Sequence, residues 1–82
     1  MKKTHTLKIE YDYYYKIKTW IKTFEIRKND RNFNIYDVIN FEIIPEKWNI
    51  YSWSISVVIT DIFQEKWFWL EEWFCILSIK II

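Results

Sequence analysis

The 82-residue chain contains no glycine, and it contains no alanine either. Loops that hold phosphate groups against the main chain need glycine, because the backbone there takes a positive φ angle or approaches the ligand more closely than a side chain permits. The sequence as written therefore excludes a P-loop, a Rossmann dinucleotide-binding turn and the GXXG loop of KH domains.

The composition predicts one folded domain. Hydrophobic residues make up 51% of the chain and aromatic residues 22%, which excludes a disordered chain and supplies the large side chains that a small core needs. A chain of this length has no room for a second core. We therefore expect a single domain spanning residues 1–82.

The charges are unevenly distributed along the chain. The net charge of +1 gives no global argument for a nucleic-acid or membrane partner. Residues 1–31, however, carry nine basic and four acidic side chains, whereas residues 32–82 carry three basic and seven acidic ones. The N-terminal part is therefore positive and the remainder negative.

One cysteine, Cys75, and one histidine, His5, exclude an internal disulfide and a zinc site built from cysteine and histidine alone. We expect no metal and no cofactor, and we expect Cys75 to be a small buried hydrophobe. Polar residues follow the N-terminal lysines, which argues against a signal peptide, and the longest uncharged stretch, 48–60, is too short to span a bilayer. These features predict a cytoplasmic protein without a membrane partner.

The hydrophobic pattern predicts five strands and one short helix. The expected strands are residues 4–10, 22–28, 38–44, 54–62 and 74–82, and the expected helix runs from Tyr13 to about Thr19 with Asp12 as its N-cap. Residues 29–32 predict a polar turn, and Pro45 closes the third strand. Consecutive strands with a helix only near the start predict an α+β fold, a small closed or nearly closed β-barrel.

Six charged residues lie within ten positions between residues 22 and 31. Alternation predicts that Phe24 and Ile26 face the core and that Glu25 and Arg27 share the opposite face, where a ligand or their own side chains bridge them. A solvated outer face with weak ion pairs is the alternative interpretation. Lys22 either snorkels at the strand end or points into a mouth of the barrel.

The segment WIKTFEIR at residues 20–27 resembles the G-x-K-x-x-E-x-R signature of ASCH domains, members of the PUA-like superfamily. Lys22, Glu25 and Arg27 match, whereas Trp20 replaces the leading glycine. Together with residues 4–9, 28–31 and 68–79, the segment resembles a small bacterial and phage family of unknown function within that group. The resemblance covers nearly the whole chain and implies a small PUA-like β-barrel.

PUA-like domains are associated with recognition of RNA and modified nucleotides, so the resemblance implies such a ligand as the partner. Lys22 and Arg27 would then contact phosphate or a base edge, and Glu25 would accept a hydrogen bond from an exocyclic amine or orient Arg27. Lys28 and Arg31 would extend the positive rim of the site.

The resemblance also implies an enzyme as the less favoured alternative. Some small single-domain proteins of the superfamily are amidohydrolases of acetylated cytidine that use a lysine, a threonine three residues later and a distant glutamate. Lys22 matches the lysine and would be the catalytic residue, but Glu25 occupies the threonine position and Thr23 points to the other strand face. Glu71 or Glu72 could supply the distant carboxylate.

His5 shares the apolar face of the first strand with Leu7. It is either a ligand-binding residue, as a proton shuttle or base contact near Lys22, or a hydrogen-bonded histidine of the core. The second interpretation is favoured.

Every tryptophan stands where the family pattern expects glycine, and Tyr36 replaces another; the tryptophans are Trp20, Trp48, Trp53, Trp67, Trp69 and Trp73. Our hypothesis is that UGA codons meaning glycine in the source genome are translated here as tryptophan. The intact mass of the protein from its native source tests this, because six complete indole side chains would contradict it.

Two alternatives treat the tryptophans as genuine. They could be stacking platforms for nucleobases. The four aromatic residues Trp67, Phe68, Trp69 and Trp73 could instead form a patch for a protein partner, which would make the chain a phage or bacterial interaction module.

Overall fold

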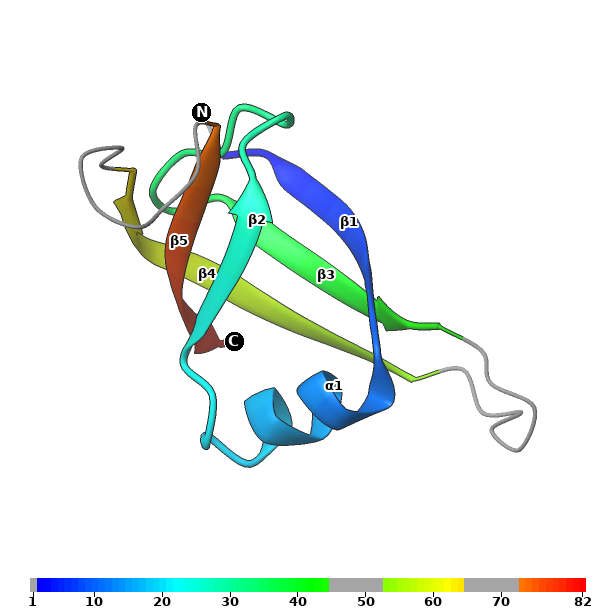
Figure 1. Cartoon of the computed structure of the whole chain (residues 1–82). Helices are drawn as coiled ribbons and strands as arrows, with labels where there is room; N and C mark the ends of the chain where they lie inside the picture. Colours follow the sequence, from blue (N-terminus) through cyan, green and yellow to red (C-terminus); the bar gives the residue numbers. More distant parts are fainter. Residues whose placement is uncertain (1, 45–52, 65–72) are drawn as a thin grey trace.

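The computed structural model describes residues 2–44, 53–64 and 73–82 (Figure 1). Its elements are, in chain order, β1 (Thr4–Ile9), α1 (Tyr11–Lys18), β2 (Phe24–Lys28), β3 (Val38–Ile43), β4 (Ser54–Phe63) and β5 (Phe74–Ile81). The five strands form one sheet that curls into a half-barrel. The predicted α+β fold with five strands and one short N-terminal helix is thereby confirmed.

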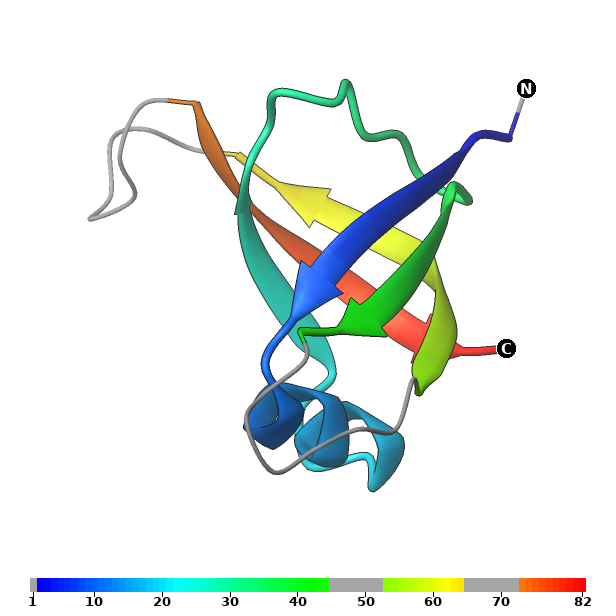
Figure 2. The same ribbon diagram turned by 90° about the vertical axis from the view of Figure 1, so that its right-hand side faces the viewer.

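The strand order is β1-β3-β4-β5-β2, so β1 and β2 are the two edges of the sheet. β1 pairs with β3 in parallel, and the other neighbours pair antiparallel. The curl turns the two edges toward each other, and α1 lies across one end of the half-barrel (Figures 1 and 2). The edges that end the sheet therefore lie on the two sides of one opening.

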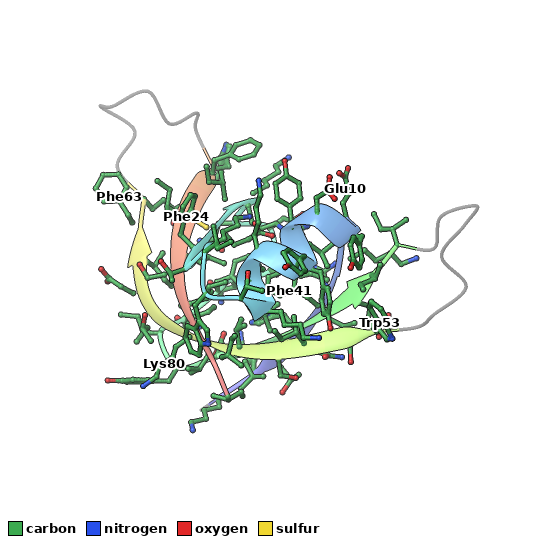
Figure 3. The ribbon with its side chains drawn as sticks, turned by 90° about the horizontal axis from the view of Figure 1, so that it is seen from below. Glu10, Phe24, Phe41, Trp53, Phe63 and Lys80 are labelled. Atoms are coloured by element: carbon green, nitrogen blue, oxygen red, sulfur yellow. The ribbon has the colours of Figure 1, made fainter. Side chains whose placement is uncertain are left out.

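The core fills the concave side of the sheet. Seen from the α1 end, Phe41 lies inside the curl, whereas Lys80 points away from it (Figure 3). Tyr14 and Ile17 of α1 are buried against this core. Buried residues alternate along β1, β3, β4 and β5, as expected for strands with one face in the core; they are Leu7, Ile9, Ile39, Phe41, Ile43, Val57, Ile59, Cys75, Leu77 and Ile79. Cys75 is fully buried as predicted, and burial raises the pKa of its thiol.

The predicted face assignment in β2 is wrong. Phe24 and Ile26 are 45% and 41% exposed, whereas Glu25 is only 6% exposed. The cause is the register with β5, because Arg27 lies opposite Cys75, whose side chain is in the core, and residues opposite each other share a face. The interpretation of Glu25 and Arg27 as a solvated outer face is therefore also wrong.

The helix begins earlier than predicted. α1 starts at Tyr11 with Glu10 as its N-cap, and Asp12 lies in the first turn, where its charge favours the helix dipole without capping. After the C-cap residue Thr19, the chain leaves the helix at Trp20, whose φ is 65° and whose N–H donates to the carbonyl of Ile17 at 3.0 Å. This is the position after the C-cap where glycine is commonest.

Four non-glycine residues of the described segments have positive φ: Trp20 at 65°, Asn32 at 52°, Tyr36 at 75° and Trp73 at 73°. Asn32 lies in the predicted polar turn, and asparagine tolerates this conformation. The other three are positions at which the sequence resemblance implies glycine, and their positive φ supports a glycine requirement there.

The positive φ angles support glycine at Trp20 and Trp73 but not at every tryptophan. Trp53 is not among the described residues with positive φ. Trp48, Trp67 and Trp69 lie outside the described residues, as do Pro45, Phe68, Glu71 and Glu72, so the expectations for them stay predictions. Among the helices of the described segments, none has the length and apolar character to cross a bilayer.

Candidate functional site: a basic pocket between two strand edges

A pocket of about 700 Å³ lies in the opening between the edge strands. Residues 8–10 at the end of β1 line one side, and residues 24–28, the whole of β2, line the other. Tyr13 and Lys16 of α1 and the following Ile21 and Lys22 complete the wall at the helix end. The pocket therefore exists because the sheet stops short of closing into a barrel.

Glu25 is the centre of an ion-pair cluster in this pocket. Its Oε1 accepts a hydrogen bond from Nζ of Lys22 at 2.6 Å, and its Oε2 accepts one from Nε of Arg27 at 3.1 Å. The three side chains are 8%, 13% and 30% exposed for Glu25, Lys22 and Arg27. Of the two predicted bridges between Glu25 and Arg27, a ligand or their own side chains, the structure shows the second, and the cluster is largely shielded from water.

Arg27 also connects the two edges of the sheet. Its Nη2 donates to the carbonyl oxygen of Lys8 in β1 at 2.7 Å, and its guanidinium carbon lies 6.0 Å from the ring centre of Phe41 in the core. A planar guanidinium has several donors in fixed directions and a flat face, so it can bond to the Lys8 carbonyl and lie near the Phe41 ring at the same time. The side chain of Arg27 therefore spans the opening between β1 and β2, which no backbone ladder among the described residues closes.

Lys22 points into the mouth of the half-barrel, as one of the two interpretations predicted. Its Nζ lies 4.5 Å from the ring centre of Tyr13 and 5.7 Å from that of Phe24, in addition to its contact with Glu25. An ammonium between a carboxylate and aromatic faces is held by both Coulomb and cation–π attraction. Lys22 is thus a fixed group of the pocket wall and not a mobile surface lysine.

The charges that line the pocket are predominantly positive. Five basic residues and two acidic ones line it; the basic residues are Lys8, Lys16, Lys22, Arg27 and Lys28, and the acidic ones are Glu10 and Glu25. Both oxygens of Glu25 are already occupied by cations of the protein. The pocket therefore attracts an anion, and the attraction will weaken as salt is added.

Two predicted site residues lie elsewhere. Arg31 is exposed and does not line the pocket. His5 is buried near the start of β1, whereas the pocket touches the end of that strand. The structure therefore brings together Lys22, Glu25, Arg27 and Lys28 of the predicted residues, and it separates His5 and Arg31 from them.

His5 belongs to a buried polar cluster with Asp37. Nε2 of His5 lies 2.8 Å from Oδ2 of Asp37, and because a carboxylate only accepts, the imidazole donates. The backbone N–H groups of Lys3 and Asn34 also donate to Asp37, at 3.1 and 3.0 Å, and the ring of Phe33 lies 4.7 Å from that of His5. His5 is therefore a hydrogen-bonded histidine of the core, as the favoured interpretation predicts. Its contact with Asp37 links β1 to the start of β3.

Acid is expected to weaken the fold through Asp37. Burial acts to raise its pKa, but the hydrogen bonds from His5, Lys3 and Asn34 outweigh burial and hold the pKa below the ordinary value of 3.8. The folded state therefore gains stability from ionised Asp37 above pH 3.8 and loses it as the pH falls through the lower, folded pKa. Urea unfolding between pH 7 and pH 2 measures this loss.

The control for this prediction is Asp37→Asn. The variant is expected to be about 1 kcal/mol less stable at pH 7, since it loses charge-assisted hydrogen bonds, and to show a flatter decline in acid. An acid decline as steep in Asp37→Asn as in the parent protein would contradict the assignment to Asp37.

The amidohydrolase arrangement is not assembled in the described part of the chain. Thr23 is exposed and absent from the pocket lining, so it does not stand beside Lys22 as a reacting group. Within residues 2–44, 53–64 and 73–82, no group of three or more histidine, cysteine, aspartate or glutamate side chains could hold a metal ion.

Some residues of the site and its surroundings were not predicted. Lys8, Tyr13 and Lys16 line the pocket only because the curl brings β1 and α1 next to β2, and no local pattern indicates this. Asp37 could have been found, because it has the parity of the inward-facing residues Ile39 and Phe41.

The fold and the pocket together define a small α+β half-barrel domain with a pocket lined mainly by basic residues between its edge strands. The chain matches the family model described as Domain of unknown function (DUF3850) over residues 4–79, and it belongs to this family. Among curated proteins, the comparison finds no match.

Proposed function

We propose that this chain binds a nucleotide, either free and modified or as part of an RNA, in the pocket between β1 and β2. The observation that carries the proposal is the Glu25-centred cluster, which fixes Lys22 and Arg27 in the wall of a pocket with an excess of positive charge. The resemblance of residues 20–27 to the ASCH signature of the PUA-like superfamily supports the same ligand class.

Each residue of the cluster has a role in this proposal. Lys22 and Arg27 donate to phosphate oxygens with the N–H groups that Glu25 and Lys8 leave unused. Glu25 orients the two cations and is not itself a ligand group, because both of its oxygens are occupied. Lys16 and Lys28, which also line the pocket, add longer-range attraction.

The size of the pocket favours one nucleotide over a longer strand. About 700 Å³ lies within the range of roughly 300 to 1,000 Å³ that is usual for pockets of small ligands and cofactors. The acidic remainder of the chain, residues 32–82, offers no extended positive track for a nucleic-acid backbone. An RNA would therefore be recognised at one nucleotide that enters the pocket.

Removing pocket cations is expected to weaken binding of a short structured RNA. The double variant Lys16→Ala/Lys28→Ala keeps the Glu25 cluster intact and is expected to bind about tenfold more weakly at low salt, with a shallower salt dependence. Lys22→Ala/Arg27→Ala is expected to bind at least about 30-fold more weakly, because it also removes the directed donors. Fluorescence anisotropy at several salt concentrations measures both.

The matched control is Lys2→Ala/Lys80→Ala, which removes two exposed lysines outside the pocket lining and the same amount of charge. Circular dichroism of every variant confirms folding before binding is measured. Equal weakening in the control and in Lys16→Ala/Lys28→Ala, or no binding by the parent protein to either RNA or mononucleotides, would refute the proposed function.

A further inference from the structure

Along the edge of β2 that does not pair with β5, alternate residues present their backbone N–H and C=O groups. Thr23 accepts from the N–H of Ile79 at 2.9 Å, and the N–H of Asn29 donates to Trp73 at 2.6 Å, so the odd-numbered residues at both ends of β2 bond to β5. Antiparallel pairs alternate between bonded and non-bonded residues. The N–H and C=O groups of the even-numbered residues therefore point away from β5.

These outward groups face the pocket. Phe24, Ile26 and Lys28 all line it, although the side chains of Phe24 and Ile26 lie on the exposed outer face. Within the described segments, the N–H and C=O groups of Ile26 have no hydrogen-bond partner. Ile26 is the middle residue of β2, so its free donor and acceptor lie at the centre of this pocket wall.

The opposite edge shows the same pattern with one difference. The carbonyl of Lys3 accepts from Val38 of β3, and that of Ile9 accepts from Ile44 just after β3, so the groups of Thr6 and Lys8 point away from β3 into the opening. The carbonyl of Lys8 is already bound by Arg27. Thr6 does not line the pocket, so among the residues that do, free main-chain groups are available mainly along β2.

The position of the Arg27 side chain limits which kind of ligand can bond to the free backbone groups of β2. An extended peptide adding a strand to β2 would run along the whole edge, but the Arg27 side chain crosses the opening to Lys8 and blocks that path. A compact planar group meets only one residue of the edge. The positive lining of the pocket supplies the complement for a phosphate attached to that group.

We propose, resting on the nucleotide-binding function above, that the main chain of Ile26 recognises the base of the bound nucleotide. A base presents a donor beside an acceptor on its Watson–Crick edge, and one edge residue of a strand presents the complementary pair. The side chains of Lys22 and Arg27 hold the phosphate, and the backbone of β2 holds the base. The Ile26 side chain lies on the exposed outer face and does not cover the N–H and C=O groups of Ile26. Recognition by the main chain therefore needs no glycine at this position.

The variant Ile26→Pro tests this directly, because it removes one N–H that the β2–β5 ladder does not use, and proline is tolerated on such edge positions. Calorimetry compares the four nucleoside 5′-monophosphates with ribose 5-phosphate, which has the phosphate and no base. The parent protein and Ile26→Val are expected to bind at least one nucleotide about tenfold more tightly than ribose 5-phosphate, and Ile26→Pro is expected to lose this advantage. Thr6→Pro, a change on the other edge outside the pocket lining, is expected to keep it.

A second measurement uses the parent protein alone, so it stands even where Ile26→Pro does not fold. Hydrogen exchange of the Ile26 amide is expected to slow about tenfold with saturating nucleotide and to stay unchanged with ribose 5-phosphate. Nucleotide binding without this protection, or with the base advantage intact in a folded Ile26→Pro, would overturn base recognition by Ile26 and leave the proposed function standing. Protection of Phe24, Ile26 and Lys28 together by an extended acidic peptide would overturn it in favour of strand addition. Failure of the parent protein to bind any nucleotide, free or within an RNA, would instead remove the proposed function.

Discussion

Replacing Glu25 by alanine is expected to lower the free energy of unfolding by about 3 kcal/mol, because the substitution leaves Lys22 and Arg27 shielded from water without a counter-charge. For a domain of this size, that corresponds to a fall in melting temperature of roughly 15 °C. Urea denaturation and a thermal melt measure the two quantities. Glu42→Ala, which changes an exposed glutamate of β3, is the matched control and is expected to cost less than about 0.5 kcal/mol.

The same cluster can be separated into its contributions to stability and to binding. Replacing all three residues by apolar side chains, as Lys22→Met/Glu25→Leu/Arg27→Met, removes the buried charges together and is expected to restore most of the stability that Glu25→Ala loses. Binding of nucleotide is expected to be lost in the triple variant, because both directed donors are removed. If Glu25→Ala costs no more than Glu42→Ala, Glu25 is not the counter-charge that holds the cluster.

Glycine at Trp20 and Trp73 is expected to stabilise the protein by about 1 kcal/mol at each position, because a bulky residue with positive φ carries a strain that glycine lacks. Trp20 follows α1, and Trp73 accepts a backbone hydrogen bond from Asn29 beyond the other end of β2, so the two sites are far enough apart for their effects to add to about 2 kcal/mol. Chemical denaturation of the two single variants and the double variant measures the gain.

Trp53→Gly is the contrasting control. The ring of Trp53 lies 6.0 Å from the rings of both Tyr11 and Tyr14, and its φ is not positive. Glycine there removes aromatic packing and is expected to destabilise the protein by about 1 kcal/mol. A loss of stability at Trp20 and Trp73 equal to that at Trp53 would show that the left-handed backbone does not demand glycine.

The glycine variants at Trp20, Trp73 and Trp53 test the hypothesis that the tryptophans arise from UGA codons meaning glycine. The left-handed backbone at Trp20 and Trp73 supports glycine at those two positions, whereas the packing of Trp53 gives no such support. The hypothesis concerns all six tryptophans, so the mass of the protein from its native source remains its direct test.

The strand faces could be predicted from the sequence wherever one face is clearly apolar. In β3, for example, Ile39 and Phe41 alternate with Asn40 and Glu42, and the structure follows this pattern. In β2 the local pattern misleads, because Phe24 and Ile26 are the apolar residues and yet lie outside. The register with β5 decides the face there, and a single strand contains no information about its partner's register.

The contacts within the candidate site could also be predicted only in part from the sequence. The spacing of Glu25 and Arg27 predicts that they share a face, because residues two apart in a strand do so in any sheet. The contact of Arg27 with Lys8 follows from the curl of the whole sheet, and neither segment indicates it alone. His5 and Lys22 lie apart because His5 is near the start of β1, whereas the pocket that Lys22 lines touches the end of that strand.

The order of the strands also has a consequence for how the molecule reaches its native state. β3, β4 and β5 follow one another in the chain and pair as antiparallel neighbours, so these contacts can form early. β1 is synthesised before β3 and can pair only after β3 has been made, and β2 must wait for β5. Both walls of the pocket therefore depend on the slowest chain closures. We expect the pocket to be the last part of the protein to form, so a ligand that binds there would act as a probe of the completed fold and would stabilise it against unfolding.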